Sequence, residues 1–267
     1  MHTFVMIHQF ARVWFRRFAE YRGTLPLQVL SNAVHYLAEM FIIWVLIDRF
    51  ERIGSWTGIE VVLLFAMDWL AYGLANFFVR FSFRSMEWDI QRGEFDEFLI
   101  RPMKPGLYYM LKRLEFYDLN FIIVNLAVLV FVFRRIGITF TFINVVWTAT
   151  IVIGAALIHA SLIMFGSVAA FWLIRTRSLS QFVVRETNEF NLYPLSIYPR
   201  YLQILLTFVI PWGFVNFYPA QYFLEKQDLL FFHPVVQYLT PIVGLVLLGA
   251  AILFWKRGLA RYQSTGT

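Results

Sequence analysis

The sequence contains no cysteine. Disulfide bonds, thiolate metal sites and cysteine nucleophiles are therefore excluded, and cysteine usage gives no indication of the redox compartment. Charge is also scarce, because only 15% of the 267 residues are charged while 60% are hydrophobic and the mean hydropathy is +0.63. Soluble domains typically carry about 25% charged residues. The composition therefore predicts an integral membrane protein.

Motifs of several enzyme and channel classes are also missing. No GxxxxGKS or GxxxxGKT loop for nucleotide phosphates occurs, and the nearest approximation, the GSWTG stretch from Gly54 to Gly58, lacks the lysine. The sequence has no HExxH zinc motif, no GxSxG nucleophile elbow, no acidic cluster with metal-binding spacing and no repeated pore helix. A Ser-His arrangement using Ser161 or Ser167 stays open, although no motif surrounds either serine. We therefore predict no catalytic residue, no metal site and no cofactor in this chain.

Six apolar stretches each approach the roughly 20 residues that a helix needs to cross a bilayer. Most lysines and arginines, including those between residues 175 and 200, flank the spans on one side, whereas Arg49, Arg52, Arg134, Arg135 and Lys226 flank them on the other. Basic residues concentrate on the cytoplasmic side, so this bias predicts a multi-pass protein of the cell inner (plasma) membrane with both termini cytoplasmic. These flanks account for the net charge of +6, and we predict no nucleic-acid partner. The expected spans cover approximately residues 25–47, 60–83, 114–133, 142–174, 201–217 and 235–255.

Residues 1–22 carry an amphipathic pattern. They are not a cleavable signal, because Arg12, Arg16 and Arg17 interrupt any apolar core of the required length. Apolar residues recur at helical spacing, which predicts an interfacial helix on the inner leaflet. Two interpretations stay open: a plain anchor to anionic lipid, or a connecting helix that abuts the loop between the second and third spans.

The fourth apolar stretch is longer than a membrane requires. A single helix over residues 142–174 would be roughly 50 Å long, so it must either tilt or project into the cytoplasm. Small residues recur in this span and in the sixth, which predicts close helix contacts within or between subunits. These residues are Gly154, Ala155, Ala156, Gly166, Ala169, Ala170, Gly244, Gly249, Ala250 and Ala251.

Between Arg84 and Arg113 the apolar chain is interrupted by about thirty residues that carry five acids, six bases, two glycines and two prolines. With both termini in the cytoplasm, this loop is cytoplasmic and is the only large polar surface there. The chain has no nucleotide-binding motif, so any work derived from ATP must enter through this loop from another polypeptide. A solvated loop with no partner is the alternative.

From Tyr193 to Pro234 the pattern becomes irregular and holds five prolines. Pro211 and Pro219 lie where the fifth span should finish, and the apolar run that follows is too short to cross twice. Non-helical backbone at membrane depth is tolerated only where protein buries it or where it lines a cavity. The pattern predicts a broken helix followed by a half-inserted outer segment over residues 219–233, with Pro211 and Pro219 at an outer gate. Ordinary proline kinks followed by an interfacial aromatic loop remain the alternative.

Four titratable residues fall inside the predicted spans, where each is costly unless it faces protein or water. Glu39 and Asp68 lie at a similar depth in the outer half, and His35 lies one helical turn deeper than Glu39. His159 lies in the inner half of the fourth span. Glu39, His35 and Asp68 could line an outer vestibule that favours cationic amphiphiles, and all four are candidates for a solute pathway. Hydrogen bonds between packed helices are the alternative.

Three segments together resemble the type-2 ABC exporter permeases, in their six-span bacterial subfamily. They are GEFDEFLIRPMKP after the second span, YPLSIYP before the fifth and IPWGFVNFYPA at its end. The likeness runs through essentially the whole chain. It implies a single transmembrane permease domain over residues 1–267 that works as a homodimer or heterodimer with two cytoplasmic ABC ATPase subunits, which would hold ATP and Mg. Many such permeases export drugs, antibiotics or lipid-like compounds.

The resemblance also implies a role for the loop between the second and third spans. In such permeases this loop forms a coupling helix that sits in a cleft of the ATPase, here Glu87 to Met103. Its charged contacts would be Glu94, Asp96, Glu97 and Arg101, its apolar edge Phe95, Phe98 and Leu99, and its limits Gly93 and Pro102. The family's re-entrant outer segment corresponds to residues 219–233.

We therefore predict an all-α integral membrane protein with six transmembrane helices. An N-terminal amphipathic interfacial helix, a cytoplasmic coupling helix and a re-entrant outer segment before the last span complete the expected fold. The expected function is the permease subunit of an ATP-driven exporter, with ATP hydrolysis in a separate subunit. A membrane-embedded enzyme, or a scaffold without an ATPase partner, is the alternative.

Overall fold

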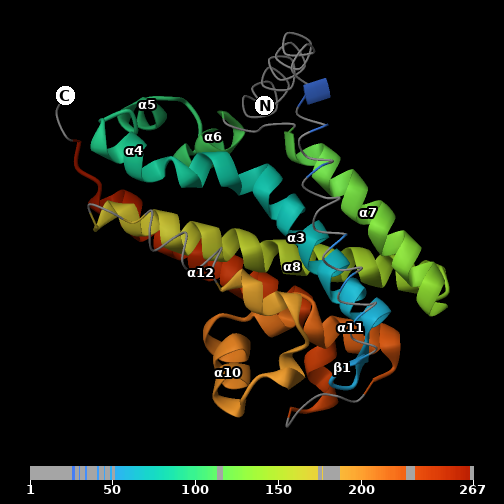
Figure 1. Cartoon of the computed structure of the whole chain (residues 1–267). Helices are drawn as coiled ribbons and strands as arrows, with labels where there is room; N and C mark the ends of the chain where they lie inside the picture. The colour runs from blue at the N-terminus through green and yellow to red at the C-terminus, as the bar shows by residue number, and fades with distance from the viewer. Residues whose placement is uncertain are drawn as a thin grey trace.

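The computed structural model describes residues 52–112, 117–173, 176, 187–226 and 232–264, together with positions 26, 27, 30, 34, 41, 45 and 49. The predicted interfacial helix of residues 1–22 and nearly all of the predicted first span lie outside this part of the chain. The described residues are mostly helical. Their strands are the two-residue β1 (Arg52–Ile53) and β2 (Trp56–Thr57), which pair antiparallel as a hairpin (Figure 1).

Four helical segments of the described chain are long and apolar enough to cross a membrane, which makes this a multi-pass membrane protein. They are Gly58–Gln91, Leu119–Ile136, Phe142–Phe171 and Thr240–Arg261, and they correspond to the predicted second, third, fourth and sixth spans. The longer helices are α3 (Gly58–Arg84), α6 (Pro105–Lys112), α7 (Tyr117–Ile136), α8 (Phe142–Val168), α11 (Phe217–Leu224) and α12 (Thr240–Arg261). The short ones are α4 (Met86–Gln91), α5 (Asp96–Leu99), η2 (Ala169–Phe171), η4 (Asn188–Leu192), η5 (Leu195–Ile197), α10 (Arg200–Ile204), η6 (Leu205–Val209), η7 (Trp212–Phe214) and η8 (Pro234–Tyr238).

The helix starts follow from local sequence. At the start of α3 the backbone N–H of Thr57 donates to Oε2 of Glu60 at 2.7 Å, which satisfies one of the backbone donors left free at a helix start. At the start of α8 the Thr141 hydroxyl accepts from the N–H of Asn144 at 3.2 Å. Between α7 and α8 the chain turns at Gly137, whose φ of 89° strongly favours glycine.

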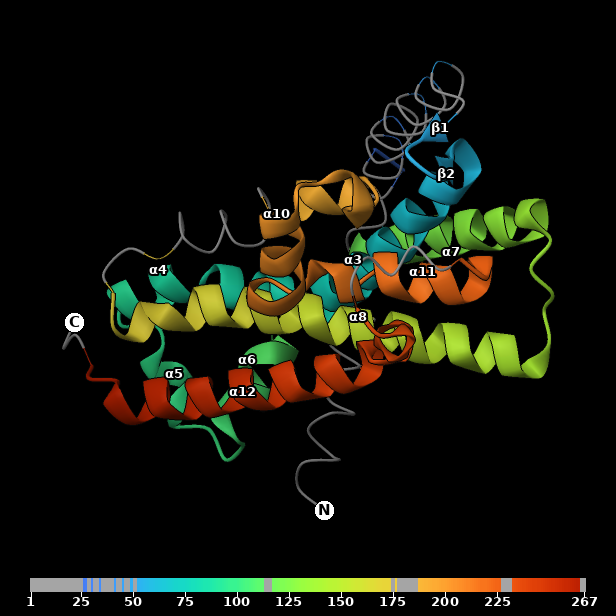
Figure 2. The ribbon, with the colours of Figure 1, turned by 90° about the horizontal axis from the view of Figure 1, so that it is seen from below.

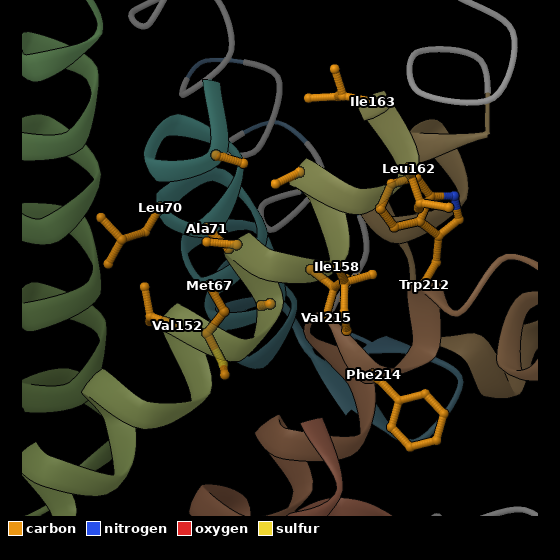
Figure 3. Close-up of a cluster of buried hydrophobic side chains, with 14 of the residues drawn as sticks. Met67, Leu70, Ala71, Val152, Ile158, Leu162, Ile163, Trp212, Phe214 and Val215 are labelled. Atoms are coloured by element: carbon orange, nitrogen blue, oxygen red, sulfur yellow. The ribbon is translucent and has the colours of Figure 1, made fainter. Parts of the chain in front are cut away.

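The core lies where α8 packs between α3 and α12. Figure 3 shows Met67 and Ala71 of α3 facing side chains of α8, while Trp212, Phe214 and Val215 approach from the segment that follows η6. All of these residues are buried. The residues that follow the break after η6 are therefore buried inside the helix bundle.

Close contact between α8 and α12 depends on glycine. The two helices run side by side in the same direction (Figures 1 and 2). A Cβ atom added at Gly244 would overlap the carbonyl oxygen of Gly154, and one added at Gly154 would lie 2.7 Å from Cα of Pro241. The prediction of close contacts between small residues of these two spans is confirmed for this pair within one chain. Gly249, in contrast, has no atom within 4 Å of the position of its Cβ.

The predicted fifth span over residues 201–217 is not one helix. Helix α10 continues as the π-helical η6 only to Val209, and the segment Trp212–Leu224 follows at an angle of 75°. Pro211 lacks an N–H group, and Ile210 before it adopts the extended conformation that a following proline favours. The broken helix that the prolines predicted is therefore present, and Figure 2 shows α10 projecting from the side of the bundle.

Thr176 and Ile197 lie at opposite ends of α3. Thr176 donates its N–H to Glu87, beyond the C-terminal end of α3, at 2.7 Å. Ile197 lies 3.6 Å from where a Cβ of Gly54 would be, before the N-terminal end of α3. The assignment of all of residues 175–200 to the inner side is therefore wrong. That assignment relied on flanking basic residues, whereas the polar groups of η4 can be buried because side chains of the bundle hydrogen-bond to them.

As a consequence, residues 200–226 start and finish near the same end of α3. Lys226 donates to the backbone carbonyl of Ser55 in the β1–β2 hairpin at 2.8 Å. Midway between these ends, the Trp212 ring lies 4.8 Å from the imidazole of His159 in α8. The segment thus enters the bundle from the hairpin end and returns to it.

Candidate functional site

The polar loop between α3 and α7 folds into three short helices instead of one coupling helix. After α4 the chain turns at Gly93, whose φ is 70°, and the N–H of Phe95 donates to the carbonyl of Asp89 at 3.0 Å. Helix α5 then starts in a new direction, and α6 leads to α7. The expected segment from Glu87 to Met103 is therefore not one helix, because Gly93 in the left-handed conformation separates α4 from α5. The predicted limits Gly93 and Pro102 do enclose α5.

Phe95 lies at the centre of a buried aromatic cluster. Its ring centroid is 5.3 Å from that of Phe171 in η2, which continues α8, 6.0 Å from Trp255 of α12 and 5.0 Å from Tyr262. Phe98 joins the same cluster, and the two side chains are 0% and 1% exposed. Their predicted place on an exposed apolar edge is wrong. Their burial against three separate elements excludes it and ties the loop to the ends of α8 and α12.

The aromatic cluster is tightly packed where it meets glycines of α12 and α6. A Cβ added at Gly258 of α12 would overlap the ring of Phe171, and one added at Gly106 of α6 would lie 3.1 Å from Nε1 of Trp255. Burial and the nearby Asp96 carboxylate raise the pKa of Tyr262 to about 12, so the phenol stays neutral at physiological pH. The loop and the two span ends form one packed unit.

Polar contacts reinforce this packing. Oε2 of Glu87 accepts from both the N–H and the hydroxyl of Thr176, at 2.7 and 3.3 Å. The buried Asp89 accepts from the Tyr109 hydroxyl at 2.6 Å, and Ser264 donates to Asp96. Glu87 and Asp96 were both predicted to face a partner, but each has a carboxylate oxygen that accepts a hydrogen bond from another residue of this chain.

Five of the predicted contact residues lie on the outward surface of the loop together with Trp88, Arg92 and Ile100: Glu94, Glu97, Leu99, Arg101 and Pro102. Ile100 is 79% exposed, and Trp88 and Leu99 are 43% and 40% exposed. Charged side chains surround them and are mutually paired, with Arg101 3.2 Å from Glu97 and Arg92 3.9 Å from Glu94. We call this set the loop surface: Trp88, Arg92, Glu94, Glu97, Leu99, Ile100, Arg101 and Pro102.

A second candidate site is the buried polar cluster around Asp68. Its Oδ1 is 3.0 Å from Nε2 of His159 and accepts from the amide of Asn191 at 3.1 Å. Asp68 and His159 are almost completely inaccessible to solvent, and Asn191 is buried. In this conformation Asp68 and His159 are paired inside the protein, which is the packing alternative and not an open vestibule.

Counting residues from each helix start misjudged the depth of the Asp68 and His159 side chains. Asp68 follows the start of α3 by about ten residues and His159 follows the start of α8 by about seventeen, yet their side chains meet. Residue counts from the two helix starts therefore do not give a common depth for the two side chains. His35 and Glu39, the other two pathway candidates, lie outside the described residues.

The cluster extends into the broken segment. The amide of Asn216 donates to the carbonyl oxygens of Leu64 and Asn191, at 3.2 and 2.8 Å. The indole N–H of Trp212 donates to the hydroxyl of Thr187 at 2.8 Å. The bond to Asn191 satisfies a backbone carbonyl of the irregular stretch beside α3, which is the condition for such backbone inside a membrane.

Lys226, at the end of the broken segment, contacts residues at the N-terminal end of α3 and in the hairpin. Nζ of Lys226 is 2.7 Å from Oε2 of Glu60 and 4.7 Å from the centroid of the Trp56 ring. Pro211 marks the bend and Pro219 lies in the first turn of α11, and both are buried. A role for these two prolines as an outer gate stays a prediction.

Several of these residues could not be identified from the sequence. Asn191 belongs to no motif, and Asn216 lies in the IPWGFVNFYPA segment with nothing there to indicate its partners, which are far away along the chain. Trp88 and Ile100 could have been proposed from their place between charged residues in a cytoplasmic loop. The burial of Phe95 and Phe98 could not be foreseen, because their aromatic partners come from three different segments.

Comparison with known proteins adds one match. The family model described as ABC-2 family transporter protein matches residues 33–266, which is most of the chain. No curated protein matches. No solved structure matches.

Proposed function

The chain belongs to the ABC-2 transporter family, and we propose that it is the permease subunit of an ATP-driven exporter. The family implies a membrane permease whose ABC ATPase partner is a separate polypeptide. Within that frame we assign the loop surface to contact with the ATPase. We further propose that two permease chains, identical or paralogous, assemble with two ATPases.

The observation that carries this proposal is the construction of the loop. Its outward face offers three apolar side chains among charged ones, and its inward face is packed through Phe95 onto the ends of α8 and α12. A surface of this composition suits a protein partner, because interfaces combine an apolar centre with a polar rim. A displacement of the loop surface would be passed directly to two membrane spans.

The proposed mechanism is mechanical. Closure of the ATPase pair on ATP pushes the loop surface, and the packed aromatic cluster moves the inner ends of α8 and α12 together. Helix α8 then carries the movement to His159, whose bond to Asp68 connects it with α3. The bond between Asp68 and His159, and the hydrogen bonds around it, would break or re-form as the two permease chains move relative to each other.

We propose a revised path for the chain across the membrane. The stretch from Thr176 to Ile197 would be the fifth crossing, and residues 200–226 would be a re-entrant segment entered from the outer side. With a first span before residue 50, this gives six crossings and leaves both termini in the cytoplasm. Two observations support this path: Thr176 and Ile197 lie at opposite ends of α3, and Lys226 is bonded to the hairpin.

The solute is proposed to be hydrophobic or amphiphilic, such as a drug, an antibiotic or a lipid-like compound. A membrane-embedded enzyme is the alternative; among the described residues no three His, Asp or Glu side chains form a group that could hold a metal ion. A scaffold without an ATPase is distinguished from a permease by the following experiment.

The test is copurification of this chain with a co-expressed candidate ABC ATPase from the same organism. We expect the Leu99→Asp/Ile100→Asp variant to lose the ATPase, because two carboxylates would be buried without partners at the contact. Arg135→Glu, at the opposite end of α7, is the matched control and should retain it. If the double variant binds the ATPase as well as the unaltered chain, the loop surface is not the contact.

A further inference from the structure

Two adjoining cavities of opposite character lie between α3, α7, α8 and α11. The first has a volume of about 410 Å³ and is lined almost entirely by apolar side chains, among them Leu70, Leu126, Phe133, Ala149 and Val152. Figure 3 shows Leu70 and Val152 directed from α3 and α8 toward α7. This cavity lies within the apolar part of three membrane spans.

The second cavity, of about 800 Å³, is polar and lies toward the hairpin end of α3. Its lining includes Glu60, Gln221, Tyr222, Glu225 and Tyr238. It is bounded by the turn between α7 and α8, by α11 and by η8. Its place next to Glu60, in the first turn of α3, puts it at the membrane boundary.

Thr139 and Asn144 line both cavities, so the two adjoin. Along α3 the linings extend from Glu60 to Leu74, which is roughly 21 Å of helix. Asn144 is held in place because its amide donates to the carbonyl of Thr139 at 2.8 Å. A molecule that filled both cavities would have a polar end at the boundary and an apolar end within the span region.

The charges of the polar cavity favour a cation. Lys226 and Glu60 also line it, and they neutralise each other at 2.7 Å. Glu225 adds a carboxylate that has no ion-pair partner among the described residues. The rings of Tyr222 and Tyr238, whose centroids are 5.6 Å apart, add electron-rich faces that attract cations.

We propose that the two cavities form one binding site for a single-chain amphiphile with a cationic head, with the head beside Glu225 and the chain between α7 and α8. The sizes of the cavities fall in the range of ligand sites. The site is open at the surface of this one chain and needs neither the ATPase nor a second permease. Its existence is therefore independent of the exporter mechanism proposed above.

The test uses a photoreactive long-chain alkylamine on the full chain in nanodiscs of neutral lipid, with labelled peptides located by mass spectrometry. We expect labelling of residues 122–153. Labelling should fall about tenfold in Ala149→Trp, because the indole fills the apolar cavity. Val146→Trp is the matched control, since Val146 lies on the same helix, is exposed and lines neither cavity.

Head-group preference provides a second measurement on the unaltered chain. A non-reactive alkylamine should compete with the probe about tenfold better than the alkyl alcohol or alkyl carboxylate of equal chain length, and Glu225→Gln should abolish that preference. The proposal is overturned if Ala149→Trp and Val146→Trp label equally, if the three competitors are equivalent on the unaltered chain, or if α12 is labelled as strongly as α8. Since copurification with the ATPase is measured separately, failure of this site and failure of the exporter proposal are distinguishable.

Discussion

Replacement of Phe95 by alanine should separate binding of the ATPase from transmission of its movement. The Phe95 side chain is fully buried and its ring lies within 6.0 Å of five others, from Phe98, Tyr109, Phe171, Trp255 and Tyr262. Removal of a buried phenylalanine costs about 3–5 kcal/mol through lost transfer energy and the remaining cavity. For a chain of this size that corresponds to a fall on the order of 10 °C in the midpoint of thermal unfolding.

The functional consequence should be selective. The loop surface is formed by other residues, so Phe95→Ala should still copurify with the ATPase. The loop would no longer be packed against the ends of α8 and α12, so fewer solute molecules should be transported for each ATP hydrolysed. The assay measures both rates in the same proteoliposomes and takes their ratio.

Two control variants sharpen the result. Phe95→Leu keeps much of the volume and should cost only about 1–2 kcal/mol with a ratio near that of the unaltered chain. Leu99→Ala, at an exposed position, should leave stability within about 0.5 kcal/mol but weaken binding of the ATPase. An unchanged transport ratio in Phe95→Ala would refute the mechanical role of the aromatic cluster.

Three further predictions concern the bundle. Gly244→Ala should destabilise the protein by about 1–3 kcal/mol in thermal unfolding because its methyl group meets α8, whereas Gly249→Ala on the same helix should be neutral; equal effects would contradict the α8–α12 contact. Asp68→Ala should cost about 3–5 kcal/mol by leaving His159 without its partner, and adding His159→Ala should cost much less than a second independent loss; strict additivity in the double-mutant cycle would argue against the pair. Lys226→Met should cost about 1 kcal/mol and increase proteolysis near residue 226, since the ion pair and the bond to the hairpin are lost; unchanged proteolysis would show that these contacts are unimportant.

The sequence predicted the class of fold and four of the spans well. Long apolar runs with basic flanks determine where helices cross a bilayer, so the predicted second, third, fourth and sixth spans each match a helix. The polar loop was also located correctly from its glycines, prolines and charges. These features are local, and they persist whatever the rest of the chain does.

Features that depend on distant partners were not predictable. The burial of Asn191 could not be recognised from the sequence, because it relies on a hydrogen bond to Asp68, more than a hundred residues earlier. The inward orientation of Phe95 relies on rings from α8, α12 and the residue after α12. Periodicity shows which residues share a face of one helix but not which other element will cover that face.

The most direct test of the central claim, that the loop surface faces the cytoplasm and meets the ATPase, is labelling at Ile100. Because the chain has no cysteine, Ile100→Cys provides a single thiol at a position that is 79% exposed. We expect a membrane-impermeant maleimide to label it only after cells are permeabilised, and less when the ATPase is co-expressed. Labelling of this thiol in intact cells would contradict the account.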